Sequence, residues 1–276
     1  MHSLTFIKEL LTSRGMSPRK GFGQNFLTDH NLIRKLVDAA AVGPGSTVLE
    51  IGPGTGTMTE ELLKRGCRVV ACEIDRGLCI WLREHFASEP RFTLIEGDCL
   101  DSKSSLSVAA MTAVGDGPFV LVSNLPYGAA TPVMSVLLSD HPACRGLFVT
   151  IQKEVADRLS ALHGSKDYGT LSVLAQTVAK VETVAKLPPG CFWPSPDVTS
   201  SMIAIRRLPE ALHPEPRRLA TFCQKLFEQR RKQIGSILGR EGPWPTGIAP
   251  EHRAEQLSVA QLITLEAARA ERGSGG

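Results

Sequence analysis

The chain lacks several patterns that would place it in a membrane or outside the cell. No window approaches the roughly 18 consecutive apolar residues that a membrane-spanning helix needs. The N-terminal residues 1–13 also lack the basic region, the uninterrupted apolar stretch and the small-residue cleavage site of a secretory signal. The seven cysteines are odd in number, and no two stand in a C-x-x-C arrangement. We therefore expect a cytoplasmic protein with no membrane segment and with reduced thiols.

The sequence also has few metal-ligand spacings and little net charge. The single His141–Cys144 spacing has no second ligand pair nearby, so the sequence predicts no metal site. The net charge of +3 is too small to indicate a polyanionic partner by itself, although clustered basic residues can still create a local basic surface. Any contact with nucleic acid has to be sought in clusters rather than in the total charge.

Short apolar runs alternate with helical patterns over the first two thirds of the 276 residues. The apolar runs cover residues 47–51, 68–73, 92–95, 119–123 and 146–151, and the helical patterns begin at residues 29, 58, 77 and 132. Runs this short and this apolar are typical of strands buried on both faces. The alternation predicts an α/β fold: a Rossmann-like, doubly wound and mostly parallel sheet.

A change of pattern after residue 208 predicts a domain boundary. The apolar run Met202–Ile205 ends in two arginines, and Pro209, Pro214 and Pro216 then exclude a continuous helix or a central strand. Apolar residues recur at helical spacing beyond this stretch. We expect a main domain over residues 1–208 and a small helical domain over residues 209–276.

A glycine-rich turn, residues 50–57, follows the first predicted strand, at the edge of the sheet where open α/β folds bind ligands. Gly52 and Gly54 belong to a G-x-G-x-G pattern, whereas dinucleotide binding requires a third glycine where the chain has Thr57. No Gly-Lys-Ser/Thr follows, which excludes a phosphate loop. The alternative is a tight turn with a purely structural role.

Acidic residues end the next two predicted strands. Glu73 stands where such folds place a carboxylate on the ribose hydroxyls, and Asp98 follows the third strand, where a carboxylate can accept the amino group of an adenine. Each acid taken singly is better explained as a helix cap. Together with the glycine-rich turn they indicate an adenosine-containing ligand without a pyrophosphate cradle, which favours S-adenosylmethionine.

The tetrapeptide Asn124-Leu125-Pro126-Tyr127 ends the fourth predicted strand. The Asn124 amide and the Leu125 carbonyl offer hydrogen-bond acceptors, Pro126 fixes the backbone, and Tyr127 offers a ring for stacking. This combination is suited to holding the exocyclic amine of a nucleobase. An ordinary strand-to-loop turn is the alternative, because Asn and Pro are common in turns.

Taken together, the motifs resemble the ribosomal RNA adenine N6,N6-dimethyltransferase family of the KsgA type, over nearly the whole chain. The segments that carry the resemblance occur in the family's order and are residues 23–27, 50–54, 124–127, 152–155 with Arg158, 168–173, 192–198 with Ser200, 230–232 and 253–258. The resemblance implies transfer of methyl groups from S-adenosylmethionine to N6 of adenosines in small-subunit ribosomal RNA, including two adjacent adenosines near the 3′ end of 16S RNA.

The resemblance also implies roles for residues that bind the cofactor. Asn25 and Leu27 are expected to close over it, Gly52 to lie beneath its methionine part, Glu73 to hold the ribose, Asp98 to bind the adenine, and Asn124 to face both cofactor and substrate. Gly54 is expected to bind the cofactor as well.

For the substrate, the resemblance implies that Tyr127 and Phe192 sandwich the target adenine beside Asn124, Leu125 and Pro126. Phe192 is equally compatible with a place in the core. Two departures from the family pattern are visible, in residues 128–132 and 233–236. They bear on the loop beside the active site and on one RNA contact.

Basic clusters are the candidates for RNA contact, namely Arg19, Lys20, Arg230, Arg231 and Lys232, with the further pairs Arg206-Arg207 and Arg217-Arg218. A charged run is more often a solvated face, and that alternative is strongest for the pair at 217–218. Clusters in both predicted domains favour recognition of a folded RNA through shape and phosphate.

The sequence therefore predicts a monomeric, S-adenosylmethionine-dependent methyltransferase whose partner is the RNA of the small ribosomal subunit. Three alternatives stay open. One is a 23S ribosomal RNA adenine methylase of the erythromycin-resistance kind, and another is a ribosome assembly factor that has lost the chemistry. DNA adenine methylation fits less well, since its usual turn carries a second Pro where this chain has Leu125.

Overall fold

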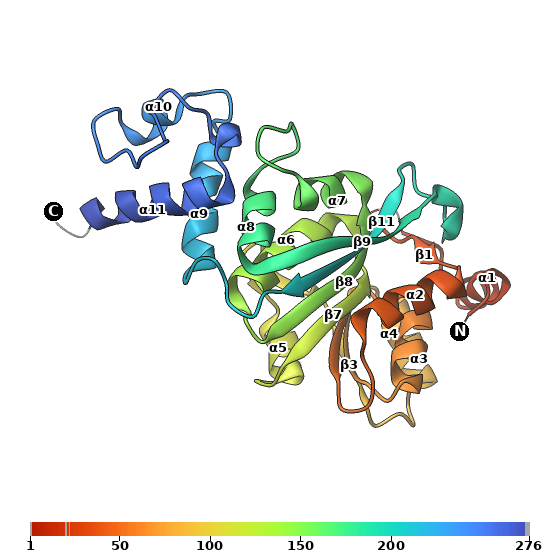
Figure 1. The fold of residues 1–276 in the computed structure, drawn as a ribbon. Coiled ribbons are helices and arrows are strands. Elements are labelled where there is room, and N and C mark those ends of the chain that lie inside the picture. Colours follow the sequence, from red (N-terminus) through yellow and green to blue (C-terminus); the bar gives the residue numbers. More distant parts are fainter. Residues whose placement is uncertain (1, 20, 22, 274–276) are drawn as a thin grey trace. The chain divides into compact units, whose positions relative to one another are not determined.

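The structure is a computed structural model that describes residues 2–19, 21 and 23–273 (Figure 1). Its helices and strands are, in order, α1 (Leu4–Ser13), β1 (Phe26–Leu27), α2 (His30–Ala40), β2 (Thr47–Ile51), α3 (Thr57–Lys64), β3 (Arg68–Glu73), α4 (Arg76–His85), β4 (Phe92–Glu96), β5 (Leu100–Ser102), β6 (Ser105–Leu106), α5 (Val108–Val114), β7 (Phe119–Asn124), α6 (Tyr127–Asp140), β8 (Cys144–Gln152), α7 (Lys153–Ser160), α8 (Thr170–Val178), β9 (Ala179–Leu187), β10 (Phe192–Trp193), β11 (Ser200–Arg207), α9 (Pro216–Phe227), α10 (Ile234–Leu238) and α11 (Val259–Gly273), with 3₁₀ turns at Pro189–Cys191 and Ala254–Gln256.

A seven-stranded sheet with the strand order β4-β3-β2-β7-β8-β11-β9 carries the fold. The strands from β4 to β8 are parallel to their neighbours, whereas β11 runs antiparallel to β8, with Ser200 opposite Gln152. The strand order reverses between β2 and β7, and such a switch point is where open α/β sheets bind ligands. The predicted doubly wound, mostly parallel α/β architecture is confirmed.

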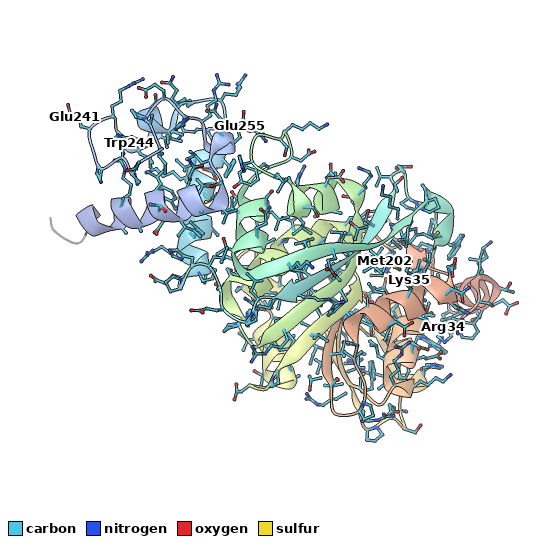
Figure 2. The ribbon with its side chains drawn as sticks, viewed as in Figure 1. Arg34, Lys35, Met202, Glu241, Trp244 and Glu255 are labelled. Carbon is cyan, nitrogen blue, oxygen red and sulfur yellow. The ribbon has the colours of Figure 1, made fainter. Side chains whose placement is uncertain are left out.

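Helices α2, α3 and α4 pack on one face of this sheet, and α5 lies on the other side of the strands (Figure 1). The shared core includes Val48 and Val69 of the strands and Leu36 of α2, each 0% exposed. Figure 2 shows Arg34 and Lys35 on the opposite side of α2, where both are exposed. The 3.6-residue period of the apolar positions therefore decides which face of α2 is buried.

Most of the predicted segments coincide with the observed elements. Asp29 caps α2, because its carboxylate accepts hydrogen bonds from the N–H groups of Asn31 (2.8 Å) and Leu32 (3.2 Å). The helix ends at Ala40, with Ala41 in the left-handed region at φ 51°. Similarly, α6 starts at Tyr127 and includes Pro132, where the predicted helix began.

The chain divides into two compact units. The first comprises residues 1–137, 141–156 and 182–206, and the second comprises residues 138–140, 157–181 and 207–276. The second unit thus includes α8, which precedes residue 209 in the sequence. The division into domains at residues 208 and 209 therefore stays a prediction.

The second unit has its own core, formed by α8, α9 and α11. Apolar residues of all three helices are buried there, among them Val173, Leu219 and Leu262, each 0% exposed. The helical pattern that the sequence shows in its last quarter therefore corresponds to one packed cluster of helices.

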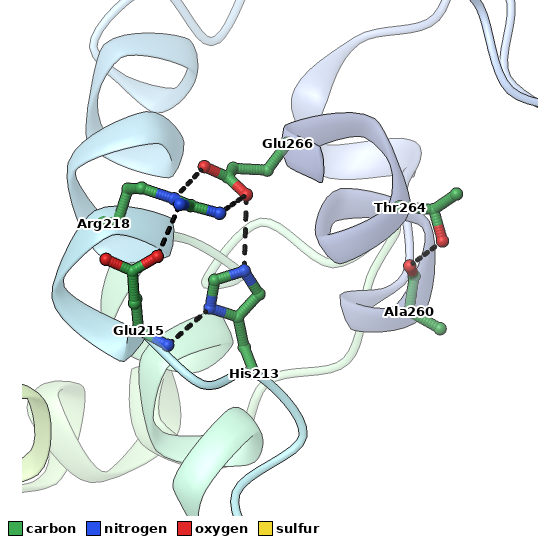
Figure 3. A network of polar contacts seen from close by, with 6 residues as sticks. All are labelled: His213, Glu215, Arg218, Ala260, Thr264 and Glu266. Carbon is green, nitrogen blue, oxygen red and sulfur yellow. Dashed lines mark hydrogen bonds and ion pairs between the residues drawn. The ribbon is translucent and has the colours of Figure 1, made fainter. Parts of the chain in front are cut away.

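A polar network joins α9 to α11 within this unit (Figure 3). The buried Glu266 carboxylate accepts hydrogen bonds from Nε (2.7 Å) and Nη2 (3.1 Å) of Arg218, and its Oε2 lies 3.3 Å from Nε2 of His213. His213 Nδ1 accepts the N–H of Glu215 at 3.1 Å. Because Nδ1 accepts, the imidazole proton stands on Nε2, and every polar group shown is satisfied inside the protein.

Within the described part of the chain, no helix combines the length and the apolar character that crossing a bilayer would require.

Candidate active site

Four strand ends meet around one cavity in the first unit. The carboxyl ends of β2, β3, β4 and β7, together with residues 21 and 23–27, line a cavity of about 550 Å³. Register explains why they meet, because Ile51 lies beside Cys72 and Glu73 lies beside Glu96 in the parallel ladders. A volume of this size is typical of a site for a small molecule or cofactor.

The glycine-rich turn forms one wall of the cavity. Gly52 and Gly54 have φ angles of +67° and +62°, in the left-handed region that favours glycine. A Cβ on Gly52 would lie 3.0 Å from Cγ of Pro126, and one on Gly54 would lie 3.0 Å from the Phe26 ring. The left-handed backbone and the close packing therefore both favour glycine at these two positions.

Glu73 stands at the end of β3 and is held by the backbone. Its Oε2 accepts the N–H of Gly54 at 3.1 Å, and its Oε1 accepts the N–H of Asp75 at 2.9 Å. Burial raises the pKa of Glu73 to about 7, because the hydrogen bonds from the backbone only partly offset the loss of water. The carboxyl group thus lines the cavity in a fixed orientation, next to the glycine-rich turn.

Asp98 also lines the cavity, beyond the end of β4. It is exposed, and its Oδ1 accepts the N–H of Leu100 at 3.0 Å. Both predicted acids therefore border the same space, one buried and one at its rim. The pairing of Glu73 with a ribose and of Asp98 with an adenine stays a proposal.

Glu50 is a cavity residue that the sequence reasoning did not assign to the site. It lies on β2, is 2% exposed and accepts a hydrogen bond of 2.7 Å from the Thr59 hydroxyl. Burial, with a smaller contribution from the charge of Glu73, raises the pKa of Glu50 to about 8. The signal was present in the sequence as an acidic residue two positions before Gly52.

The N-terminal segment closes the cavity on another side. Asn25 and Leu27 both line it, and Leu27 of β1 pairs with Phe192 of β10. The Asn25 carbonyl accepts a hydrogen bond of 2.9 Å from Nδ2 of Asn124, which lies 99 residues further along the chain. The structure thus brings the predicted cover of the cofactor into direct contact with the predicted acceptor of the substrate amine.

The Asn124 turn borders the same cavity. Because Nδ2 of Asn124 is used by Asn25, Oδ1 is the end of the amide that is left to accept a hydrogen bond from a ligand. The N–H of Leu125 donates to the Thr150 carbonyl at 3.1 Å, and the hydrogen bonds of α6 begin at the carbonyl of Pro126. The Leu125 carbonyl therefore stands before the first carbonyl that accepts a hydrogen bond within α6.

Tyr127 is the first residue of α6 and is half-buried at the cavity. Its hydroxyl lies 3.0 Å from the hydroxyl of Ser200 on β11. This contact holds the tip of the phenol of a residue that borders the cavity.

Phe192 is placed differently from its predicted partner Tyr127. It is 4% exposed and belongs to the core cluster of the sheet, together with Leu27. Among the described residues that line the cavity, Phe192 is absent, whereas its strand partner Leu27 is present. Stacking of an adenine on Phe192 stays a prediction, and its core position is what the structure shows.

The predicted RNA-contacting residues are also in different situations. Arg19 is exposed and forms an ion pair with Asp75 at 3.4 Å, and Lys20 lies outside the described residues. Arg230 donates hydrogen bonds to Glu255 and to the carbonyls of Ser165 and Lys166, so its guanidinium serves to hold a loop of the second unit.

Its two neighbours in the sequence, Arg231 and Lys232, are both exposed. The structure therefore separates the cluster at 230–232 into one inward-bonded arginine and two solvent-facing cations. Contact of any of these residues with RNA stays a prediction.

Comparison with known families decides which reaction this site serves. The sequence profile of ribosomal RNA adenine dimethylase matches residues 15–270. The chain belongs to the ribosomal RNA adenine dimethylase family. Members of this family are S-adenosylmethionine-dependent methyltransferases, and the family therefore makes the chain an S-adenosylmethionine-dependent enzyme.

Relatives within this family match over most of their length. A ribosomal RNA small subunit methyltransferase A from Moorella thermoacetica is 37% identical over 93% of this chain and 94% of its own. The protein of the same description from Phenylobacterium zucineum is 38% identical over 96% of this chain and 93% of its own.

Two solved structures share the fold of this family member. A dimethyladenosine transferase from Plasmodium falciparum superposes with a TM-score of 0.70 at 20% identity, over 89% of this chain and 98% of its own. The 23S rRNA methyltransferase ErmE superposes with a TM-score of 0.66 at 25% identity, over 89% of this chain and all of its own (100%).

Proposed function

We propose that this chain methylates N6 of adenosines in small-subunit ribosomal RNA, and that it dimethylates two adjacent adenosines near the 3′ end of 16S RNA during subunit biogenesis. The observation that carries the proposal is the hydrogen bond between Asn25 and Asn124 at one cavity, since it joins the residue that would cover the cofactor to the residue that would accept the amine. The small-subunit assignment rests on relatives that are 37–38% identical over at least 93% of the chain.

The polar groups that line the cavity fit S-adenosylmethionine. Glu73 would hold the ribose hydroxyls and Asp98 the adenine amine, since carboxylate oxygens accept such hydrogen bonds. The glycines at 52 and 54 let the ligand approach the backbone closely. Glu50 adds a buried carboxyl that favours a ligand with positive charge, because a nearby cation stabilises its ionised form.

When bound, S-adenosylmethionine supplies an electrophilic methyl group on a sulfonium. The task of the protein is then to orient the adenine amine. Oδ1 of Asn124 and the Leu125 carbonyl would accept the two hydrogens of N6, which favours a tetrahedral nitrogen with its lone pair free to attack. Such preorganised acceptors act without a strong general base.

Tyr127 would provide a stacking face for an adenine that has left its helix. Stacking on one aromatic ring returns about 1–3 kcal/mol per base, which offsets part of the cost of extrusion. The contact between Tyr127 and Ser200 holds the ring in place before the base arrives.

Recognition of the RNA would involve Arg19, Arg231 and Lys232, which are exposed cations of the described chain. We further propose that the enzyme acts as a monomer in the cytoplasm, where ribosomal subunits are assembled. Shape and phosphate contacts suit a folded RNA substrate.

The test is methylation of separated ribosomal subunits with radiolabelled S-adenosylmethionine, followed by digestion of the RNA to nucleosides. We expect the label in N6,N6-dimethyladenosine from small subunits that lack this modification. Label in the RNA of the large subunit would instead identify a 23S methylase, and absence of cofactor binding would identify an assembly factor without chemistry.

A further inference from the structure

A cluster of two histidines and a glutamate lies outside the cavity. Nε2 of His2, which precedes α1, is 2.9 Å from Oε1 of Glu60 on α3. Nε2 of His85, the last residue of α4, is 2.8 Å from the same oxygen. One ligand atom from each of the three residues lies within 4.8 Å of the other two.

Surrounding contacts hold both histidines in place. The His2 carbonyl lies 2.7 Å from Nε2 of His30 at the start of α2, and the His2 ring packs 4.3 Å from the ring of Phe6. The His85 ring stacks on Trp81 at 4.5 Å. Neither imidazole therefore depends on the glutamate alone for its orientation, which is what a preorganised ligand set requires.

The cluster has a buried side and an open side. The His2 side chain is 6% exposed, whereas those of Glu60 and His85 are 24% and 28% exposed. The Glu60 carboxylate faces two imidazole nitrogens at this boundary between buried and open sides.

The buried histidine has a further unusual atom. Within the described residues, Nδ1 of His2 is buried and has no hydrogen-bond partner. An ion on Nε2 would place the ring proton on Nδ1, so metal binding at this histidine requires that Nδ1–H gain an acceptor, such as a water molecule.

We propose that His2, Glu60 and His85 bind a divalent cation of borderline softness, zinc in the first place, through two imidazole nitrogens and one carboxylate oxygen. Zinc takes such ligands at about 2.0–2.2 Å in a tetrahedron, so that ligand atoms stand about 3.3 Å apart. The two short contacts, 2.8 and 2.9 Å, need only a small separation to admit the ion. Water completes the tetrahedron on the open side.

The site differs from the prediction of no metal that the sequence suggested. The ligands come from three separate elements and are 58 and 25 residues apart along the chain, so that no local spacing reveals them. Only the packing of α1, α3 and α4 brings them together.

The proposed ion would fasten the N-terminal segment behind the cofactor cavity. Glu60 belongs to the helix that follows the glycine-rich turn, and the Trp81 indole donates a hydrogen bond of 3.0 Å to the carbonyl of Thr55 in that turn. On the other side, Ile7 of α1 packs in a cluster with Phe26 and Leu78, which both line the cavity. The ion would therefore stiffen the cavity from outside without touching a ligand in it.

The experiment is a titration of the full-length, metal-free protein, purified with a histidine-free C-terminal tag, with zinc chloride and separately with cobalt chloride. We expect one zinc per chain and a cobalt spectrum typical of nitrogen and oxygen ligands. In His85→Gln and in Glu60→Gln the affinity should fall by about 100-fold or more, since even residues that only orient ligands are worth 10- to 100-fold.

His163→Gln is the matched control, because His163 is exposed and lies outside the cluster, and it should bind zinc as the wild type does. The ring of Trp81 stacks on His85, so a change in tryptophan fluorescence on addition of zinc should occur in the wild type and be lost in His85→Gln. Wild-type protein that binds no zinc, unchanged affinity in the folded His85→Gln and Glu60→Gln variants, or a sulfur-to-cobalt band from a cysteine site would each overturn the proposal.

Discussion

The cavity of the first unit and the network around Glu266 in the second unit treat polar groups in opposite ways. Around Glu266, each hydrogen-bonding group meets a partner within the protein, so the network is closed (Figure 3). At the cavity, the backbone holds Glu73 and Asn25 holds Asn124, but acceptor capacity is left toward open space. The difference shows that a polar cluster suited to a ligand can be recognised by the hydrogen-bond acceptors that its contacts within the protein leave unsatisfied.

The largest effect should follow from removal of the open amide. Asn124→Ala should lower the turnover of methyl transfer by about 10²- to 10³-fold, because one preorganised hydrogen-bonding group is worth that much. Radiolabel transfer to small subunits measures the turnover, and calorimetric titration measures cofactor binding. Asn31→Ala, at an exposed position of α2, is the matched control. Near-normal turnover in Asn124→Ala would exclude the assigned role.

Next in size is the loss of the carboxylate that we propose holds the ribose. Glu73→Gln should weaken S-adenosylmethionine binding by about 10- to 100-fold, since hydrogen bonds to a charged group contribute about 1.5–3 kcal/mol. Glu96→Gln changes the neighbouring residue of the ladder, outside the cavity, and should bind as the wild type does. If both variants bound the cofactor equally well, the ribose assignment of Glu73 would be wrong.

The cluster at 230–232 tests the same distinction between open and closed groups for cations. The double charge reversal Arg231→Glu with Lys232→Glu should weaken RNA binding by roughly 10-fold and lower its salt slope by about 1–2, because each lost phosphate contact removes about one released counterion. Filter binding at several salt concentrations gives both values.

A matched control is the same reversal at Arg34 and Lys35, which are exposed on α2 (Figure 2). The RNA affinity of this control variant should stay close to that of the wild type, apart from the small loss that any change of net charge causes. A loss of equal size in both double variants would show that the effect is not specific to residues 231 and 232.

The closed network should instead affect stability. Glu266→Gln leaves Arg218 and the buried His213 without their carboxylate, so the midpoint of thermal unfolding should fall by roughly 3–6 °C, which is ordinary for a lost buried polar contact. Differential scanning calorimetry measures the midpoint. Cofactor affinity should be unchanged, and a selective loss of that affinity would contradict the separation of the two regions.

The smallest effect concerns pH. The folded pKa of Glu50, about 8, lies above its ordinary value of 4.5, so the folded state binds more protons between these pH values. Stability of the ligand-free protein should therefore fall as pH rises through this window. Glu50→Gln should flatten this fall by a few degrees in the unfolding midpoint. An unchanged pH profile would mean that Glu50 ionises normally.

Much of the fold could be predicted because the central strands are buried on both faces. Their apolar runs, such as Val69–Ala71, stand out from any local context. By contrast, β9 lies at the edge of the sheet, and its sequence Ala179–Leu187 mixes charged with apolar residues. Tertiary pairing, rather than an apolar run, decides that this segment is a strand.

Part of the site could be predicted for a similar reason. Strand ends are marked in the sequence, and parallel register brings Glu73 and Asn124 to one edge. The burial of Phe192 and the inward bonding of Arg230 depend on contacts with residues far along the chain, Leu27 and Glu255. Local residue types and motifs do not reveal such long-range contacts. The cluster of His2, Glu60 and His85 could not be predicted from the sequence for the same reason.

Gly52 of the glycine-rich turn lies close to Pro126 of the Asn124 turn. A Cβ at residue 52 would stand 3.0 Å from Cγ of Pro126, so the proline ring would have to shift by a few tenths of an ångström. If Gly52 borders the methyl donor and Pro126 borders the acceptor amine, as proposed above, this close approach helps to set the distance between them. Reaction rates fall steeply when reacting atoms are misplaced by even 1 Å. Under this proposal, an alanine at residue 52 would push the two turns apart and lengthen the distance between the methyl group and the N6 amine.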